Sequence, residues 1–186
     1  MNGKKRKVLM AAFAVIAALL LVTGCSKAQP SGEVNKFDSD QNIIITVGET
    51  RFGASICADY RKDGSSTGEN AAYYKIKDGD KNLKTLVISK SDDAELDFES
   101  AEFIEKYEKG LKGATKVDKK SVKAEVVDFR GGKAMKFYMV QADSDVALES
   151  AGLSFNNNGK NYTLVIYSQV GDPTAELDAV AASLDY

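Results

Sequence analysis

Ser66 lies in the pattern of this sequence that comes nearest to a catalytic motif. It occupies the centre of Gly64-Ser65-Ser66-Thr67-Gly68, which matches the G-x-S-x-G turn that presents a nucleophilic serine to a histidine base. The sequence contains no histidine, and residues 62–70 are polar and predict a loop. We therefore expect Ser66 to have no catalytic role.

Cys57 is a second candidate nucleophile. The absence of histidine removes Cys-His catalysis and histidine-based zinc sites, so a reactive thiol would need another source of thiolate stabilisation. Cys57 lies in or beside an expected strand. We interpret it as an inert thiol, and the sequence leaves its role open.

Two acidic stretches could ligate a cation. Asp78, Asp80 and Asn82 have the alternating oxygen ligands of an EF-hand loop, but Leu83 and Ser89 occupy the positions of its glycine and its bidentate glutamate. The second stretch reads as a solvated loop before a helix, where acids suit the helix dipole. Its cation binding stays open, and no metal or cofactor is predicted. The acids of this stretch are Asp92, Asp93, Glu95, Asp97 and Glu99.

The charge distribution limits the choice of partners. Lysines are dense over 112–123, which indicates a solvated face, with contact to anionic lipid or cell-wall polymer as the alternative. The whole chain has a net charge of −2, and the basic N-terminus contributes four positive charges, Lys4, Lys5, Arg6 and Lys7. Without that terminus the chain is more acidic, which argues against nucleic-acid binding.

The N-terminus has the layout of a secretory signal. A basic cluster precedes the apolar run 8–22, and small residues follow it. At about 1.5 Å per residue, a helix over this run would be about 22 Å long, which is short of the roughly 30 Å hydrocarbon core of a bilayer. A cleaved signal is therefore favoured over a retained membrane anchor.

The residues Leu21-Val22-Thr23-Gly24-Cys25 resemble the lipobox of bacterial lipoproteins. This resemblance implies cleavage between Gly24 and Cys25 and a diacylglycerol on the Cys25 thiol, with 1–24 as the signal peptide. Two acyl chains form a lasting anchor. It also implies an extracytoplasmic location on the cell membrane, or on the outer membrane of a two-membrane envelope. The alternative is an ordinary signal peptide that ends near a cysteine.

One globular domain is expected after a tether. Residues 25–41 are polar and lack periodicity, so we predict a lipidated flexible tether followed by a domain over 42–186. With Cys25 lipidated, Cys57 has no disulfide partner in the chain. Strands are predicted over 42–47, 52–60, 73–76, 83–89, 122–129, 134–140, 153–155 and 162–167, with helices over 97–113 and 173–184.

Cap residues and buried stripes follow from this pattern. Asp97 and Asp172 are the expected N-caps, and Gly113 is expected to close the first helix. Asp78-Gly79 and Asn158-Gly159 each predict a tight hairpin turn, and the strands over 122–129 and 134–140 are expected to be joined across Arg130-Gly131-Gly132-Lys133. The predicted helix stripes are Ala101, Ile104, Tyr107 and Leu111 in the first helix and Leu177, Val180 and Leu184 in the second.

This order predicts an α+β fold, an antiparallel sheet with two amphipathic helices packed on it. From Phe129 onward the chain resembles the PsbP-like and DcrB-like exported domains. The matching residues are Phe129-Arg130-Gly131-Gly132-Lys133-Ala134, the run 158–164 and the end Ser183-Leu184-Asp185-Tyr186. The resemblance implies a PsbP-like α/β sandwich that binds partners or acts as an accessory subunit, without shared catalytic residues.

Two function classes remain compatible with the sequence. The first is a membrane-anchored binding or accessory domain with an envelope protein or cell-wall partner, and it is not an enzyme. The second is an envelope hydrolase or transferase that uses carboxylates or Ser/Lys. The sequence identifies neither the ligand nor the oligomeric state.

Overall fold

A computed structural model describes residues 40–91, 95–141 and 147–186. Gly24, Cys25 and the signal peptide lie outside these residues, as do positions 25–39 of the expected tether and Asp92 and Asp93 of the acidic stretch. The first strand begins at Asp40, two residues before the expected domain boundary at 42. No helix among the described residues is long and apolar enough to cross a membrane.

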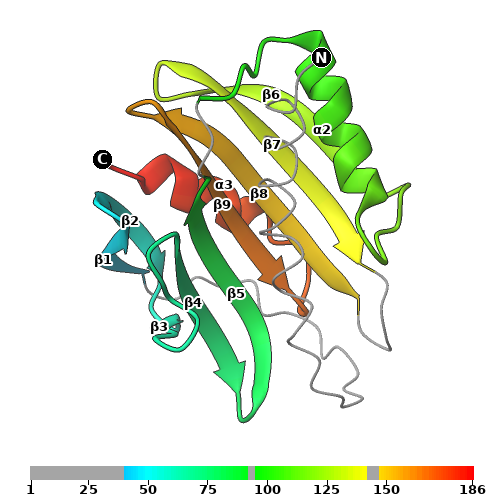
Figure 1. The fold of residues 1–186 in the computed structure, drawn as a ribbon. Coiled ribbons are helices and arrows are strands. Elements are labelled where there is room, and N and C mark those ends of the chain that lie inside the picture. The colour runs from blue at the N-terminus through cyan, green and yellow to red at the C-terminus, as the bar shows by residue number, and fades with distance from the viewer. Residues whose placement is uncertain (1–39, 92–94, 142–146) are drawn as a thin grey trace.

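The centre of the fold is a seven-stranded antiparallel sheet (Figure 1). Its spatial order is β3-β4-β5-β9-β8-β7-β6. The strands are β3 (Arg61–Lys62), β4 (Ala71–Asp78), β5 (Lys81–Lys90), β6 (Lys123–Phe129), β7 (Gly132–Gln141), β8 (Leu148–Asn157) and β9 (Lys160–Ser168). A separate hairpin is formed by β1 (Asp40–Val47) and β2 (Thr50–Cys57).

The tight turns predicted from the sequence set the register of three hairpins. Gly79, Gly131 and Gly159 each have a positive φ, the conformation that glycine adopts without a steric penalty. Asn158 also has a positive φ, so Asn158-Gly159 forms the expected turn between β8 and β9. The three predicted hairpins are confirmed.

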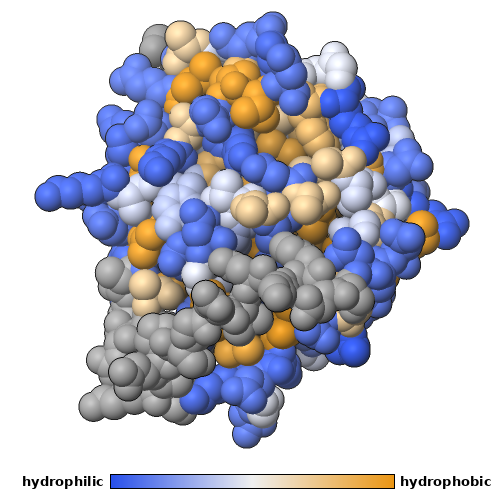
Figure 2. Space-filling model, turned by 180° about the vertical axis from the view of Figure 1, so that it is seen from behind, coloured by the Kyte–Doolittle hydropathy of each residue, from blue (hydrophilic) through white to orange (hydrophobic). Residues whose placement is uncertain are grey.

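The two faces of the sheet form two different cores. On one face, α3 (Thr174–Ser183) and the β1–β2 hairpin pack on large aliphatic and aromatic side chains. On the other face, α2 (Ala101–Gly113) packs near β6 and β7. We call these the α3 face and the α2 face. Figure 2 shows the molecule from the side of the α3 face, where hydrophilic residues surround patches of hydrophobic ones.

The predicted α+β class is confirmed, with one difference in the arrangement. The strands over 42–47 and 52–60 do not join the large sheet; they form the separate hairpin, and β2 ends at Cys57. The two helices lie on opposite faces, so the sheet is buried on both sides. Alternating apolar residues predict a buried face but do not identify the layer that covers it.

The start of α2 differs from the prediction. Ser100 is the N-cap, and its side chain accepts a hydrogen bond from the Phe103 amide, whereas the Asp97 carboxylate accepts from the Glu99 amide in the loop before it. Tyr107 and Leu111 are buried as expected. Ala101 is exposed, because the helix begins only at that residue.

The end of α2 and the start of α3 also differ from the prediction. Gly113 is the last residue of α2 and lacks a positive φ, so it does not form a left-handed cap. Pro173 stands at the N-cap position of α3, and the Asp172 carboxylate instead accepts the Thr174 amide at 2.8 Å. The predicted stripe of Leu177, Val180 and Leu184 is buried.

The C-terminus closes the core of the α3 face. The backbones of Gly53 in β2 and Asp185 exchange two hydrogen bonds, at 2.7 and 2.9 Å. They hold the Tyr186 ring against Phe52 and Phe155, with centroids 5.4 and 5.7 Å away. The β1–β2 hairpin is therefore bonded to the chain end beyond α3.

Gly152 in β8 is required by close packing across the sheet. A Cβ atom at this position would lie 2.2 Å from the Phe137 ring. Gly152→Ala should lower the free energy of unfolding by about 1–3 kcal/mol through overpacking, measured by chemical denaturation. Gly113→Ala is the control, because nothing lies within 4 Å of that Cβ position. Phe137→Leu should recover part of the loss in the double variant; a Gly152→Ala protein as stable as the wild type would contradict this packing.

Candidate functional site

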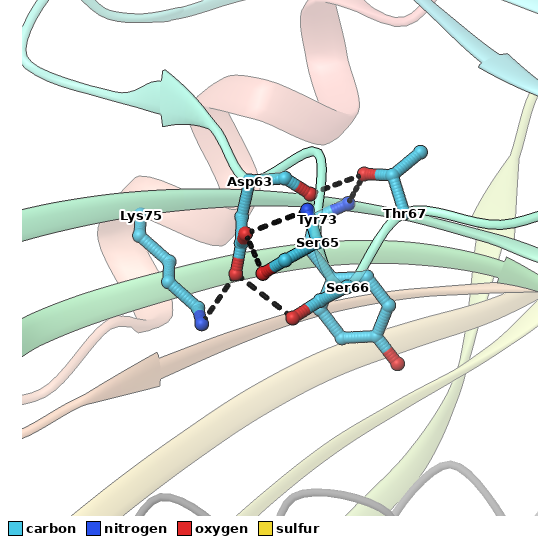
Figure 3. Close-up of polar contacts among 6 residues, drawn as sticks. All are labelled: Asp63, Ser65, Ser66, Thr67, Tyr73 and Lys75. Carbon is cyan, nitrogen blue, oxygen red and sulfur yellow. Dashed lines mark hydrogen bonds and ion pairs between the residues drawn. The ribbon is translucent and has the colours of Figure 1, made fainter.

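Asp63 organises the loop that contains the G-x-S-x-G pattern (Figure 3). Its Oδ1 accepts the Ser65 hydroxyl at 2.6 Å and the Ser65 amide at 3.1 Å. Its Oδ2 accepts the Ser66 hydroxyl at 2.8 Å and lies 2.5 Å from the Lys75 Nζ. The Thr67 hydroxyl donates to the Asp63 carbonyl and accepts the Tyr73 amide. These contacts tie the loop between β3 and β4 to the edge of the sheet.

This geometry gives Ser66 a structural role. Its hydroxyl donates to a carboxylate that Lys75 already neutralises, and the loop leads to strand β4 rather than to a helix. The hydrogen bond from Lys75 and those from the two serines hold the pKa of Asp63 well below its usual range. The cluster therefore stabilises an ionised carboxylate that shapes a turn.

Asp63 predicts a pH dependence of stability. A carboxyl whose pKa is lowered by folding contributes stability above its unfolded pKa, about 3.9, and this contribution is lost as the pH falls through the folded value. Asp63→Asn should cost about 1–2 kcal/mol of unfolding free energy at pH 7, with the difference from wild type shrinking below about pH 4. Asp59→Asn, at an exposed position, is the control. A difference that stays constant between pH 7 and pH 2 would contradict the assignment.

A buried ion pair links α3 to the sheet. Glu176, which is 3 % exposed, accepts the Tyr60 hydroxyl at 2.7 Å and contacts the Lys84 Nζ at 2.6 Å. Burial, followed by the Glu176 charge, raises the pKa of the Tyr60 phenol far above its usual value. The motifs in the sequence did not predict this network. The sequence feature that could have predicted it is the position of Glu176 four residues before Val180, which places Glu176 on the buried side of the helix.

Removing one partner should show how much the pair of Lys84 and Glu176 contributes to the free energy of unfolding. Lys84→Met leaves the Glu176 carboxylate buried with Tyr60 alone and should lower the unfolding free energy by about 2–4 kcal/mol. Lys106→Met breaks the exposed pair with Glu102 and should cost less than about 0.5 kcal/mol. Both unfolding free energies are measured by chemical denaturation at pH 7. Equal losses in the two variants would show that the buried pair stabilises the fold no more than the exposed pair.

A groove of about 500 Å³ beside β6 and β7 is the candidate binding surface of the described residues. Tyr138 donates to Glu149 at 2.7 Å, and Lys123 lies 5.8 Å from the Tyr138 ring centroid. Burial and then the Glu149 contact raise the pKa of Tyr138, which keeps its phenol neutral. Side chains of both charges line the groove, which suits a polar partner. The lining charges are Glu108, Lys123, Glu125, Lys136 and Asp172.

A second groove, of about 520 Å³, joins the acidic stretch to the β6–β7 turn. Asp97 and Glu99 line it together with Lys133, whose pKa is raised mainly by its hydrogen bond to Asp128. Glu95 accepts the Gly159 amide. Within the described part of the acidic stretch, the Glu95 and Asp97 carboxylates thus accept backbone amides, and no cluster of three potential metal ligands occurs among the described residues.

Cys57 lies at the end of β2, half-buried against the core of the α3 face. Its thiol is free among the described residues, and Cys25, the other cysteine of the sequence, lies outside them. In the basic segment, Lys112 pairs with Glu108 on α2, and Lys123 contacts the Tyr138 ring. These two lysines therefore have partners within the domain.

No protein-family model matches the sequence, and no curated protein matches it significantly. The structure is similar to that of a Bacteroides thetaiotaomicron protein, with 13% identity over 72% of this chain and a TM-score of 0.49. This chain spans 44% of the length of that protein. It is also similar to LpqN, described as involved in cell envelope biogenesis of Mycobacterium tuberculosis, with 14% identity, coverage of 78% and 90%, and a TM-score of 0.48. Both scores lie below 0.5, so neither likeness assigns a family or function.

Proposed function

We propose that the protein is an extracytoplasmic lipoprotein whose domain acts as a binding or accessory module of the cell envelope. The observation that carries this proposal is the run Leu21-Val22-Thr23-Gly24-Cys25 at the end of a 15-residue apolar segment. A diacylglycerol on Cys25 would hold the chain at the membrane, and the polar tether would separate the domain from the lipid surface.

Features of the domain support binding rather than catalysis. The hydroxyls of Ser65 and Ser66 and the amine of Lys75 all contact Asp63, so these groups hold one another in a turn. The groove beside β6 and β7 offers side chains of both charges to an envelope protein or cell-wall polymer. The sheet with a C-terminal helix is the arrangement expected of a PsbP-like or DcrB-like domain, and we include that membership in the proposal.

The anchor is tested by removing its acceptor thiol. Metabolic labelling with a radioactive fatty acid should mark the wild type and leave Cys25→Ala unlabelled, because the thioether needs the Cys25 sulfur. Cys57→Ala is the matched control and should label like the wild type. The labelled protein should partition into detergent, and the chain from Ser26 to Tyr186 should stay in water. Label on Cys25→Ala, or loss of label in Cys57→Ala, would contradict the lipoprotein assignment.

A further inference from the structure

Strand β6 forms one outer edge of the seven-stranded sheet. It is seven residues long, whereas β3, at the opposite edge, has two. The strand contains no proline and no glycine. An edge strand of this kind presents a row of backbone amides and carbonyls with which another strand can pair. The sheet can therefore be extended at β6.

The hairpin geometry shows which backbone groups of β6 point outward. Phe129 and Gly132 flank a two-residue turn, so they exchange both backbone hydrogen bonds, and every second residue along β6 does the same with β7. Val140 continues this alternation on β7, since it accepts the Asp118 amide and donates to the Ser121 hydroxyl on the β6 side. The backbone groups that point outward therefore belong to the intervening residues, and they have no backbone partner among the described residues. These are Ala124, Val126 and Asp128.

Open space lies next to the first half of this edge. The groove of about 500 Å³ is lined there by Lys123, Ala124 and Glu125. Lys123 and Glu125 are exposed, and Ala124 is half-buried. On one side of the sheet α3 packs on β2, β8 and β9, and on the other α2 borders the groove through Glu108. The outward groups at the start of β6 thus face a groove.

The charges of β6 are complementary to those of a second β6. Lys123 and Glu125 lie two residues apart, so their side chains share the α3 face of the sheet. Glu125 forms no ion pair with a described residue, and Lys136, which lies opposite it on β7, pairs with Asp178 of α3. In an antiparallel pair of β6 strands with Ala124 opposite Ala124, Lys123 of each copy lies opposite Glu125 of the other. Opposite charges at such positions stabilise a strand pair.

The same charges select one register. Outward residues must face outward residues to form hydrogen bonds, so the registers next to this one are centred on Lys123 or on Glu125. The first places Lys123 opposite Lys123, and the second places Glu125 opposite Glu125; both are destabilised by repulsion. In the register centred on Ala124, Lys123 and the partner's Glu125 form a non-hydrogen-bonded pair, the type in which facing side chains lie closer.

We propose that two copies of the protein pair through β6, antiparallel about a two-fold axis at Ala124, so that the sheet continues from one copy into the other. Two reciprocal ion pairs between Lys123 and the partner's Glu125 set the register. A two-fold contact uses the same edge of both copies, so assembly through β6 ends at the dimer. This inference deepens the proposed binding function by naming a second copy as a partner at the groove, and it rests on that proposal for the groove as a binding surface.

The test uses the chain from Ser26 to Tyr186, which contains every described element and both cores, with a reductant that keeps the Cys57 thiol free. Sedimentation equilibrium should show a monomer–dimer equilibrium at concentrations up to about 1 mM. Lys123→Glu and Glu125→Lys should each raise the dissociation constant about tenfold, because each variant puts two like-charged pairs in the contact. Lys62→Glu, on exposed β3, makes the same change in charge as Lys123→Glu and should dimerise like the wild type.

Restoring the charge match separates this contact from any other. The Lys123→Glu and Glu125→Lys chains, mixed in equal amounts, should form a heterodimer more tightly than either forms a homodimer, because opposite charges face each other again. The chain with both substitutions should dimerise like the wild type. This recovery also excludes misfolding as the cause of the single-variant losses. A peptide of residues 121–127 should compete with dimerisation.

Several outcomes would overturn the inference. These are a wild type that stays monomeric up to about 1 mM, a dimer that both single variants leave unchanged, equal weakening by Lys62→Glu, or a mixture that associates no more tightly than its components. A monomeric chain that binds the peptide of residues 121–127 would identify a strand of another protein as the occupant instead. The tested chain lacks Cys25, so the result is independent of lipidation, and failure of fatty-acid labelling would leave it unchanged.

Discussion

Burial of β9 and β8 on both faces is the constraint on which the rest of the structure depends. These strands lie in the middle of the sheet, so each side chain must pack against a layer on one side or the other. The α3 face meets this demand with a close-packed apolar and aromatic core, sealed by the backbone pairing of Gly53 with Asp185. The core extends from the β1–β2 hairpin to the C-terminus, which makes the two ends of the domain interdependent.

Two-sided burial also determines which polar groups the fold can hold. Glu176 is tolerated in the core of the α3 face because Tyr60 and Lys84 reach it from different elements. Ser154 and Thr163 are tolerated on the α2 face because they bond to one another. The Ser150 and Tyr167 hydroxyls and the Asn82 Oδ1 in β5 are exceptions among the described residues, since they are buried without a hydrogen-bond partner there.

The arrangement separates the parts of the molecule that bear on function. The proposed anchor, Cys25, precedes the described domain in the chain, whereas the mixed-charge groove lies at the β6 side of the sheet. The loop that contains Ser66 forms a turn around Asp63, to which the Ser66 hydroxyl donates a hydrogen bond. The proposed binding function is compatible with this arrangement, because the groove beside β6 and β7 is lined by side chains of both charges.

The sequence by itself determined the elements and their order. Period-two runs with Asp78-Gly79 and Asn158-Gly159 predicted the hairpins, and the stripe of Leu177, Val180 and Leu184 predicted the face of α3, because turn chemistry and apolar periodicity act locally. The absence of histidine removed Ser66 from consideration as a triad nucleophile. The hairpins and the stripe depend on neighbours within a few residues in the chain.

Only the tertiary structure decided which surfaces meet. It placed the helices on opposite faces, separated β1 and β2 from the large sheet, and put the N-cap of α2 at Ser100 instead of Asp97. It also joined Glu176 to Tyr60 across 116 positions of sequence and set Ser150 opposite Tyr167. Local periodicity states that a side chain points inward, but its partner depends on strand order and layer, which arise from packing between residues far apart in the chain.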